Sequence, residues 1–125
     1  MDKNDIIKEF GKLVNISRNA GLDALGDYIE GKRLKNPPEN VKLLFDLIDS
    51  LNIEQKNQLQ KGISFIIDLS FFKFLSLLEN TKMPNFRIEL KLIESEDDIL
   101  LIGENEDNEL NLKYWSWIKS SNVSD

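Results

Sequence analysis

The chain has 125 residues, 41% of them hydrophobic, and its 22 acidic and 16 basic side chains give a net charge of −6. That charge argues against nucleic-acid binding, because such a protein needs a basic face to displace counterions from phosphates. Cysteine and histidine are both absent, which excludes disulfides, thiolate zinc sites and a cysteine nucleophile, and removes the commonest general base and transition-metal ligand.

A chain of this length is expected to form one domain over residues 1–125. We expect a helical part over residues 1–82, a sheet over residues 83–118 and a frayed tail over residues 119–125. The N-terminal MDKNDIIKEF lacks the apolar run of a secretory signal. The most hydrophobic stretch, residues 63–78, spans about 24 Å as a helix, which is short of a ~30 Å hydrocarbon core. We therefore expect a cytoplasmic location and no membrane partner.

The first apolar residues of the chain repeat at helical spacing, which predicts a helix. They are Ile6, Phe10 and Leu13. Asn4 is the expected N-cap and Gly21 the expected end of this helix. A short second helix is expected over residues 22–30.

The linker of residues 31–36 carries the one dense basic cluster of the chain. Its members are Lys32, Arg33 and Lys35. In a protein this acidic, we expect these side chains to neutralise one of the protein's own acidic turns or to remain solvated. Binding of phosphate or of an acidic partner is the alternative.

Two capping signals predict the next two helices. Asn36 precedes two prolines and Glu39, a pattern typical of a helix start with a capping box. Asn52 with Gln55 repeats the pattern and opens a long helix that we expect to run to about Asn80.

The second half of that long helix is apolar on every side. Its few polar residues are spread around the helix axis: Ser64, Asp68, Ser70, Lys73 and Ser76. A helix of this kind is normally central to its fold or covered by another subunit. We expect a core helix, with a homodimer seam over residues 63–78 as the alternative.

After residue 84 the apolar period changes from helical to two, which is typical of half-buried strands. Phe86, Ile88, Leu90 and Leu92 alternate with Arg87, Glu89 and Lys91 in the first expected strand. Residues 98–103 form the second, and Leu110, Leu112 and Tyr114 face inward in a third that reaches about residue 117. Short turns favour an antiparallel meander. The predicted fold is therefore α+β, with about four helices followed by three strands.

Acidic residues are concentrated around the second expected strand. Residues 1–62 hold ten acids and ten bases, whereas residues 63–125 hold twelve acids and six bases. Eight acids lie in residues 94–109: Glu94, Glu96, Asp97, Asp98, Glu104, Glu106, Asp107 and Glu109. A six-residue strand would separate them into two poles about 17–20 Å apart. Solvated turns that discourage aggregation, docking of a basic protein and a metal site are the alternatives, although the spacing of a calcium loop is missing.

The outer face of the predicted sheet is a candidate binding surface. Residues 99–102 are apolar in sequence, so the middle strand is apolar on both faces. Alternation places Trp115 and Trp117 outward, and tryptophan is enriched among interface anchors. Packing of both rings in the protein's own core is the alternative.

Sequence signals for catalysis are weak. The chain has no G-x-S-x-G, P-loop or G-x-G-x-x-G motif. A carboxylate pair such as Glu94 and Glu96 suits glycoside hydrolysis, but it lies in expected turns without a cleft. We therefore expect no enzyme, no cofactor and no metal.

The whole layout resembles the small acidic bacterial immunity proteins of contact-dependent and other polymorphic toxin systems. The resemblance rests on the apolar residues 63–78, the acidic residues 94–109 and the aromatic residues 114–118. It implies a non-enzymatic protein that binds and occludes a basic toxin domain, such as a nuclease. The alternative is a structural or regulatory homodimer packed through residues 63–78.

Overall fold

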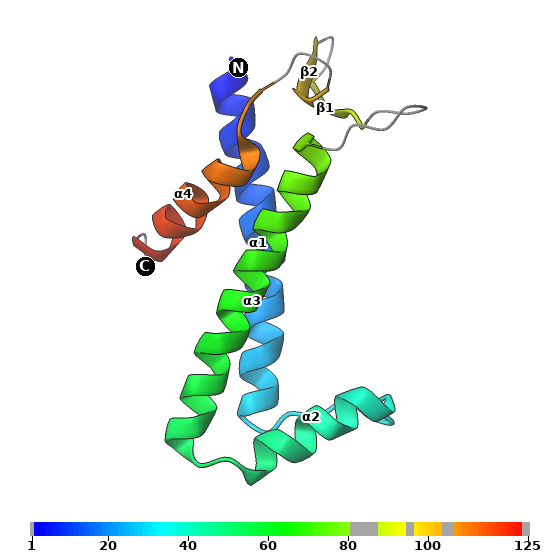
Figure 1. The fold of residues 1–125 in the computed structure, drawn as a ribbon, viewed down its shortest axis with the longest axis vertical. Coiled ribbons are helices and arrows are strands. Elements are labelled where there is room, and N and C mark those ends of the chain that lie inside the picture. Colours follow the sequence, from blue (N-terminus) through cyan, green and yellow to red (C-terminus); the bar gives the residue numbers. More distant parts are fainter. Residues whose placement is uncertain (1, 81–87, 95–96, 104–106, 124–125) are drawn as a thin grey trace. The chain divides into compact units, whose positions relative to one another are not determined.

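The computed structural model describes residues 2–80, 88–94, 97–103 and 107–123. The elements are α1 (Lys3–Ile29), α2 (Glu39–Ser50), α3 (Ile53–Asn80), β1 (Leu90–Glu94), β2 (Asp97–Ile102) and α4 (Leu110–Val123), as shown in Figure 1. The protein is α+β with a helical N-terminal half, as predicted. The described residues form a two-stranded antiparallel sheet and do not include a third strand.

The chain divides into two compact units. The hairpin unit comprises Met1–Ile16 and Leu69–Asp125, and the α2 unit comprises Ser17–Asp68. Each of the long helices α1 and α3 therefore contributes one part to each unit. The single domain expected over residues 1–125 stays a prediction.

The helix α1 is continuous where the sequence predicted two helices. Gly21 lies inside α1 and does not end it, because an internal glycine costs a helix only about 1 kcal/mol relative to alanine. The start of α1 is capped by Asp2 and Asp5: Asp2 Oδ1 accepts from the Asp5 N–H at 2.9 Å, and Asp5 Oδ2 accepts from the Asp2 N–H at 3.3 Å. Asn4, the predicted cap, lies within the first turn. Residues 2–80 thus hold three helices in place of the predicted four.

The starts of α2 and α3 give one wrong prediction and one confirmed prediction. The helix α2 begins at Glu39 with Pro38 as its N-cap and without a side-chain cap. Asn36, the predicted cap, has a φ of 56°, a left-handed conformation that asparagine tolerates in turns. At α3, Asn52 Oδ1 accepts from the Gln55 N–H at 2.8 Å, and Gln55 Oε1 accepts from the Asn52 N–H at 3.0 Å. The capping box of α3 and its predicted end are confirmed.

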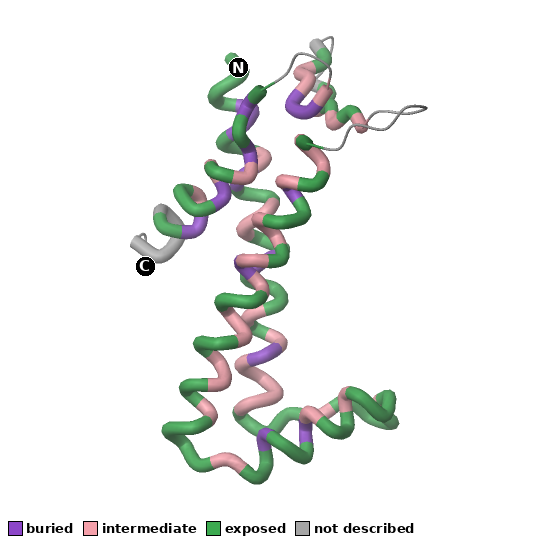
Figure 2. The backbone as a smooth tube through the Cα atoms, viewed as in Figure 1, coloured by how far each residue is buried: buried purple, intermediate pink, exposed green. Residues whose placement is uncertain are grey.

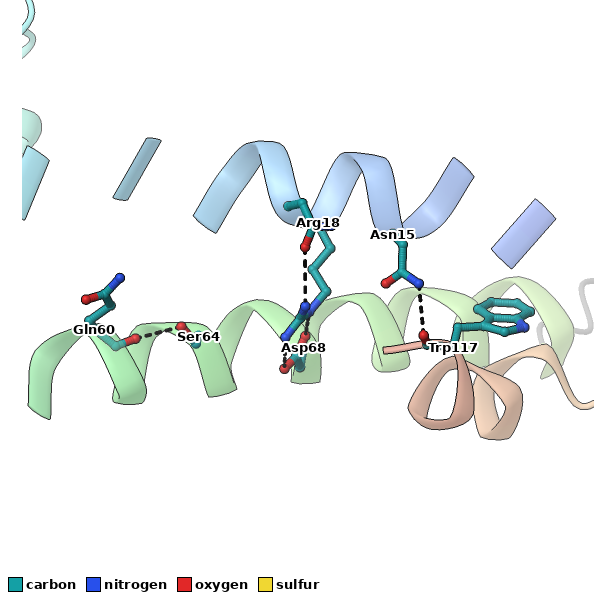
Figure 3. A network of polar contacts seen from close by, with 7 residues as sticks. Asn15, Arg18, Gln60, Ser64, Asp68 and Trp117 are labelled. Carbon is teal, nitrogen blue, oxygen red and sulfur yellow. Dashed lines mark hydrogen bonds and ion pairs between the residues drawn. The ribbon is translucent and has the colours of Figure 1, made fainter. Parts of the chain in front are cut away.

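A buried ion pair joins α1 to α3 inside the α2 unit. Arg18 Nε lies 2.5 Å from Asp68 Oδ1, and Arg18 Nη2 donates to Asp68 Oδ2 at 3.3 Å (Figure 3). The two-pronged pairing compensates two charges that are both buried. In the same unit, the rings of Tyr28 and Phe45 pack edge to face, with 5.1 Å between their centroids.

The basic linker neutralises acids of its own unit. Lys32 Nζ lies 3.3 Å from Asp27 Oδ1, and Arg33 Nη2 lies 2.5 Å from Asp49 Oδ1. The Arg33 guanidinium also covers the Phe45 ring at 4.7 Å from its centroid, a cation–π contact. These acids belong to α1 and α2, so they are not the acidic turns that the sequence suggested as partners.

The hairpin unit has an apolar core. Its buried members come from α1, α3, β2 and α4: Ile6, Ile7, Leu75, Leu101, Ile102, Leu110, Tyr114 and Ile118 (Figure 2). Ile88, Leu90 and Leu92 pack against this cluster, which confirms the predicted inward face of the first strand in its described part. Phe86 and Arg87 lie outside the described residues.

The hairpin β1–β2 confirms the predicted pairing of the first two strands. They run antiparallel, with Leu92 opposite Ile99, Ile93 opposite Asp98 and Glu94 opposite Asp97. The predicted bounds differ from those of the structure. The first strand was expected to end at Leu92 but β1 extends to Glu94, and the second was expected to begin at Asp98 but β2 begins at Asp97.

The predicted third strand is wrong, since residues 110–117 lie in the helix α4. Leu110 and Tyr114 fit a period of two, but together with Ile118 they also recur every four residues, which is a helical spacing. All three are buried, whereas Leu112, which was predicted to face inward, is 55% exposed. The pattern of burial is therefore that of a helix.

A carboxylate from α3 caps the start of α4. Glu79 Oε2 accepts from the Leu110 N–H at 2.9 Å, and Glu79 Oε1 accepts from the Asn111 N–H at 2.8 Å. A helix start needs such acceptors for its first N–H groups. The helix continues to Val123, so residues 119–123, predicted to be frayed, are helical.

Candidate protein-binding surfaces

The acidic residues of the predicted binding site lie at two places in the hairpin unit. Those at the turn end of the hairpin are Glu94, Asp97 and Asp98. Those between β2 and α4 are Asp107 and Glu109, which are both exposed. Glu96, Glu104 and Glu106 lie outside the described residues. For the described acids, the division into two groups that the sequence predicted is present.

Buried Asn108 fixes the position of the second acidic group. Its Nδ2 donates to the Leu101 carbonyl at 2.8 Å, and its own carbonyl accepts from Lys113 Nζ at 2.5 Å. Asp107 and Glu109 are therefore held near the Leu101 end of β2, whereas Asp98 lies near the other end. Sequence reasoning missed Asn108, because one asparagine in a polar run carries no signal of burial.

Ile93 adds an apolar side chain to the acidic end of the hairpin. It lies on β1 directly opposite Asp98 and is 75% exposed. An exposed, large apolar side chain beside carboxylates is a natural anchor for a partner of opposite charge. The first strand predicted from the sequence ends at Leu92, so alternation gave no signal for Ile93.

Trp115 lies on a helix and not on the outer face of a sheet. Its ring centroid is 5.7 Å from that of Phe72 and 5.5 Å from that of Tyr114. Trp115 is 37% exposed, which lies between the outward position and the core packing that the sequence left open. A role for Trp115 in partner binding stays a prediction.

Trp117, predicted to face outward, packs against the core of the hairpin unit. Its ring meets that of Phe10 edge to face at 5.9 Å, and Asn15 Nδ2 donates to its carbonyl at 2.9 Å (Figure 3). Gly11 allows the close approach, since a Cβ at this position would lie 2.6 Å from the indole. Trp117 faces inward because α4 is a helix. In a strand, Trp115 and Trp117 would share one face, whereas in a helix residues two positions apart point to different sides.

The helix α3 buries one side and leaves large apolar side chains exposed on another. Leu75 is buried in the core of the hairpin unit, yet Phe74 and Leu77 in the same unit are 57% and 59% exposed. In the α2 unit, Phe65 and Ile66 are more than half exposed as well. Residues 63–78 thus form a core helix only in part. Across the described residues, none of the helices has the length and apolar character needed to cross a membrane.

The described side chains offer surfaces for contact. Among them, no group of three or more acidic side chains is placed to hold a metal ion, and one member of the carboxylate pair considered for hydrolysis, Glu96, is not described. The described side chains that could contact a partner include carboxylates, an exposed isoleucine and exposed apolar residues on a helix. In comparisons with known proteins, no family model, no curated protein and no solved structure matches the chain.

Proposed function

We propose that this chain is a non-enzymatic protein-binding protein that docks a basic partner on the acidic end of the hairpin β1–β2. The specific form of the proposal is an immunity protein that covers the substrate groove of a basic toxin domain. Two features on which the resemblance rests remain, the helical N-terminal half and the acidic run. The expected third strand does not, because residues 110–117 are helical.

The observation that carries the proposal is the exposure of Ile93 next to acidic residues. The Ile93 side chain is 75% exposed, and contact between its apolar surface and water is unfavourable. A partner that covers this side chain would gain the free energy of burying it. Asp98 lies directly opposite Ile93 in the hairpin and is exposed, so it supplies negative charge next to this side chain. A partner with a basic group facing Asp98 and an apolar surface facing Ile93 would therefore match both side chains.

Electrostatics would set the rate and the choice of partner. A chain with a net charge of −6 attracts a basic surface, and such steering raises association rates to about 10⁸–10⁹ M⁻¹s⁻¹ at low salt. Occlusion of a groove needs no bond making or proton transfer. Inhibition by binding alone therefore suits a chain without cysteine or histidine.

Affinity capture from lysate of the cell that makes the protein tests the proposal. The hairpin variant Glu94→Gln, Glu96→Gln, Asp97→Asn, Asp98→Asn is compared with a matched variant that neutralises Glu104, Glu106, Asp107 and Glu109. We expect the wild-type chain to capture a basic protein, identified by mass spectrometry, with affinity falling as salt rises.

The hairpin variant and Ile93→Ser should each weaken capture at least tenfold, whereas the matched variant should weaken it less. Equal capture by the wild type and the hairpin variant at low and high salt would rule out docking at the hairpin. If the matched variant alone loses binding, the docking site is the second acidic group.

A homodimer packed through α3 is the second candidate function. The observation in its favour is the exposure of Phe74 and Leu77, which lie three positions apart and so on one side of the helix. Single exposed apolar residues are normal, but several large ones on one helix side are typical of a contact surface.

Light scattering at micromolar concentration tests the homodimer. A dimer through α3 should dissociate in the variant Phe74→Ser, Leu77→Ser and persist in the control Leu43→Ser, Leu47→Ser, whose residues are exposed on α2. A wild-type chain that is monomeric throughout would exclude this candidate.

A further inference from the structure

A groove in the hairpin unit runs between the N-terminal half of α1 and α4. Its volume is about 790 Å³, within the range of about 300–1,000 Å³ that small-molecule sites occupy. The described residues that line the groove belong to α1 and α4, and none of them comes from β1, β2 or α3. An inference from it is therefore independent of the proposed protein-binding function.

The lining of the groove is apolar along part of its length. Trp117 from α4 and Ile7 and Ile16 from α1 contribute to it. Ile7 is buried and belongs to the core of the hairpin unit, whereas Ile16 is well exposed. Because Gly11 has no side chain, the indole of Trp117 lies directly against the backbone of α1. Such a surface accepts an aliphatic or aromatic group by burying it.

Of the described residues that line the groove, the charged ones are lysines. Lys8 and Lys12 come from α1 and Lys113 comes from α4, so positive charge reaches the groove from both sides. Lys12 is also paired with Glu9 at 2.8 Å, which reduces but does not cancel this charge. Lys113 Nζ donates to the Asn108 carbonyl at 2.5 Å; this acceptor is neutral, so the ammonium keeps its charge and its two other protons. The net charge of the chain is −6, whereas the described residues that line this groove include three lysines and no carboxylate.

The indole nitrogen of Trp117 adds one donor. Its Nε1 makes no hydrogen bond within the part of the chain that the structure describes. An acidic group held by the lysines is a suitable acceptor for such an N–H.

From this combination we propose that the groove binds a small amphipathic organic anion. Its apolar body lies on Trp117, Ile7 and Ile16, and its acid group lies among Lys8, Lys12 and Lys113. One acid group joined to one apolar body matches the groove in charge, in polarity and in size. A medium-chain carboxylate has this chemistry.

Titration with dodecanoate below its micelle concentration tests the proposal. In the variant Trp115→Phe, the remaining tryptophan is Trp117, so its fluorescence reports on the groove. We expect a saturable change in this fluorescence. Dodecanol, which has the same body without the charge, should bind at least tenfold more weakly.

Variants of the lining residues distinguish binding in the groove from non-specific attraction of the anion to positive charge elsewhere on the protein. Lys8→Gln, Lys12→Gln, Lys113→Gln should weaken dodecanoate binding about tenfold. Lys35→Gln, Lys42→Gln, Lys61→Gln changes the net charge equally, outside the groove, and should leave binding unchanged. Ile16→Asp places a negative charge at an exposed position of the lining and should weaken binding at least as much as the first variant.

Three results would overturn the proposal. They are the absence of saturation with dodecanoate, equal binding of dodecanol, and equal weakening by the two lysine variants. An oligoglutamate peptide is titrated alongside. If the peptide binds through Lys8, Lys12 and Lys113 and dodecanoate does not bind, the groove is a site for an acidic protein segment and the small-molecule proposal is wrong.

Discussion

The hairpin unit and the α2 unit bury different kinds of side chain. The core cluster of the hairpin unit is formed by apolar residues together with Tyr114. The α2 unit buries the pair Arg18 and Asp68 alongside a few apolar residues such as Phe45 and Ile48. An apolar core loses stability in proportion to the volume removed from it, whereas a buried charge is stable only while its partner is present.

We therefore expect the two units to respond to substitution in different ways. In the hairpin unit, the cost of a change should follow the size of the deleted side chain and its burial. In the α2 unit, the cost should depend on whether one charge is left without its partner. Four variants test this comparison, two at the centres of the units and two at helix starts.

The largest effect is expected for Tyr114→Ala at the centre of the hairpin unit. Tyr114 is fully buried and stacks on Phe71, with 5.7 Å between the ring centroids. Its truncation should lower the free energy of unfolding by about 4 kcal/mol, measured by urea denaturation. The control Leu112→Ala, at an exposed position, should cost less than about 1 kcal/mol. Equal costs would contradict a helical α4, since a strand turns Leu112 and Tyr114 to the same face.

The next effect is expected for Asp68→Leu at the centre of the α2 unit. It leaves the Arg18 guanidinium buried without its carboxylate, which should cost about 3 kcal/mol. The double variant Arg18→Met, Asp68→Leu should recover most of this loss, as judged from the same unfolding curves. A double variant no more stable than Asp68→Leu would show that lost packing, and not an unpaired charge, explains the cost. As a comparison, Asp27→Leu breaks a half-exposed pair and should cost less than about 1 kcal/mol.

A smaller effect is expected for Glu79→Ala, which removes the cap of α4. The first turn of α4 then loses two charge-assisted hydrogen bonds, which should cost about 2 kcal/mol. Unfolding monitored by circular dichroism measures the loss. The control Glu9→Ala removes an exposed ion pair with Lys12 and should cost less than about 0.5 kcal/mol. If the two variants lose the same stability, Glu79 does not act as a cap.

The smallest effect is expected for Asn52→Ala, which breaks the capping box of α3 in the α2 unit. The loss should be about 1 kcal/mol, measured by thermal and urea unfolding together. The control Asn57→Ala, at an exposed position further along α3, should cost nothing, because alanine is the better helix former. A matching loss at Asn57 would mean that the hydrogen bonds of Asn52 contribute little.

The sequence predicted those parts of the fold whose causes are local. Asn52 and Gln55 are three positions apart and cap α3 as expected. Alternation over a few residues located the inward face of β1, and the acidic run that follows led to the hairpin as a candidate site. Each of these predictions depends on groups that are neighbours along the chain.

The predictions that failed concern residues with partners far along the chain. Leu110 and Tyr114 fit the spacing of a strand and that of a helix equally well. The acceptor for the N–H of Leu110 is Glu79, which is 31 positions away. The burial of Asn108 depends on its bond to Leu101. The exposure of Ile93 could not be read from the pattern either, because it depends on what covers each side of the hairpin.

By itself, then, the sequence determined the α+β class, the long capped helix α3, the pairing of β1 with β2 and the acidic character of the C-terminal half. The tertiary structure decided that residues 110–123 are helical, that Trp117 packs inward and that Arg18 meets Asp68 across 50 positions. The reason is physical. Periodicity and capping act within one or two turns of a helix or along one strand, whereas burial and ion pairing depend on which distant segments the folded chain brings together.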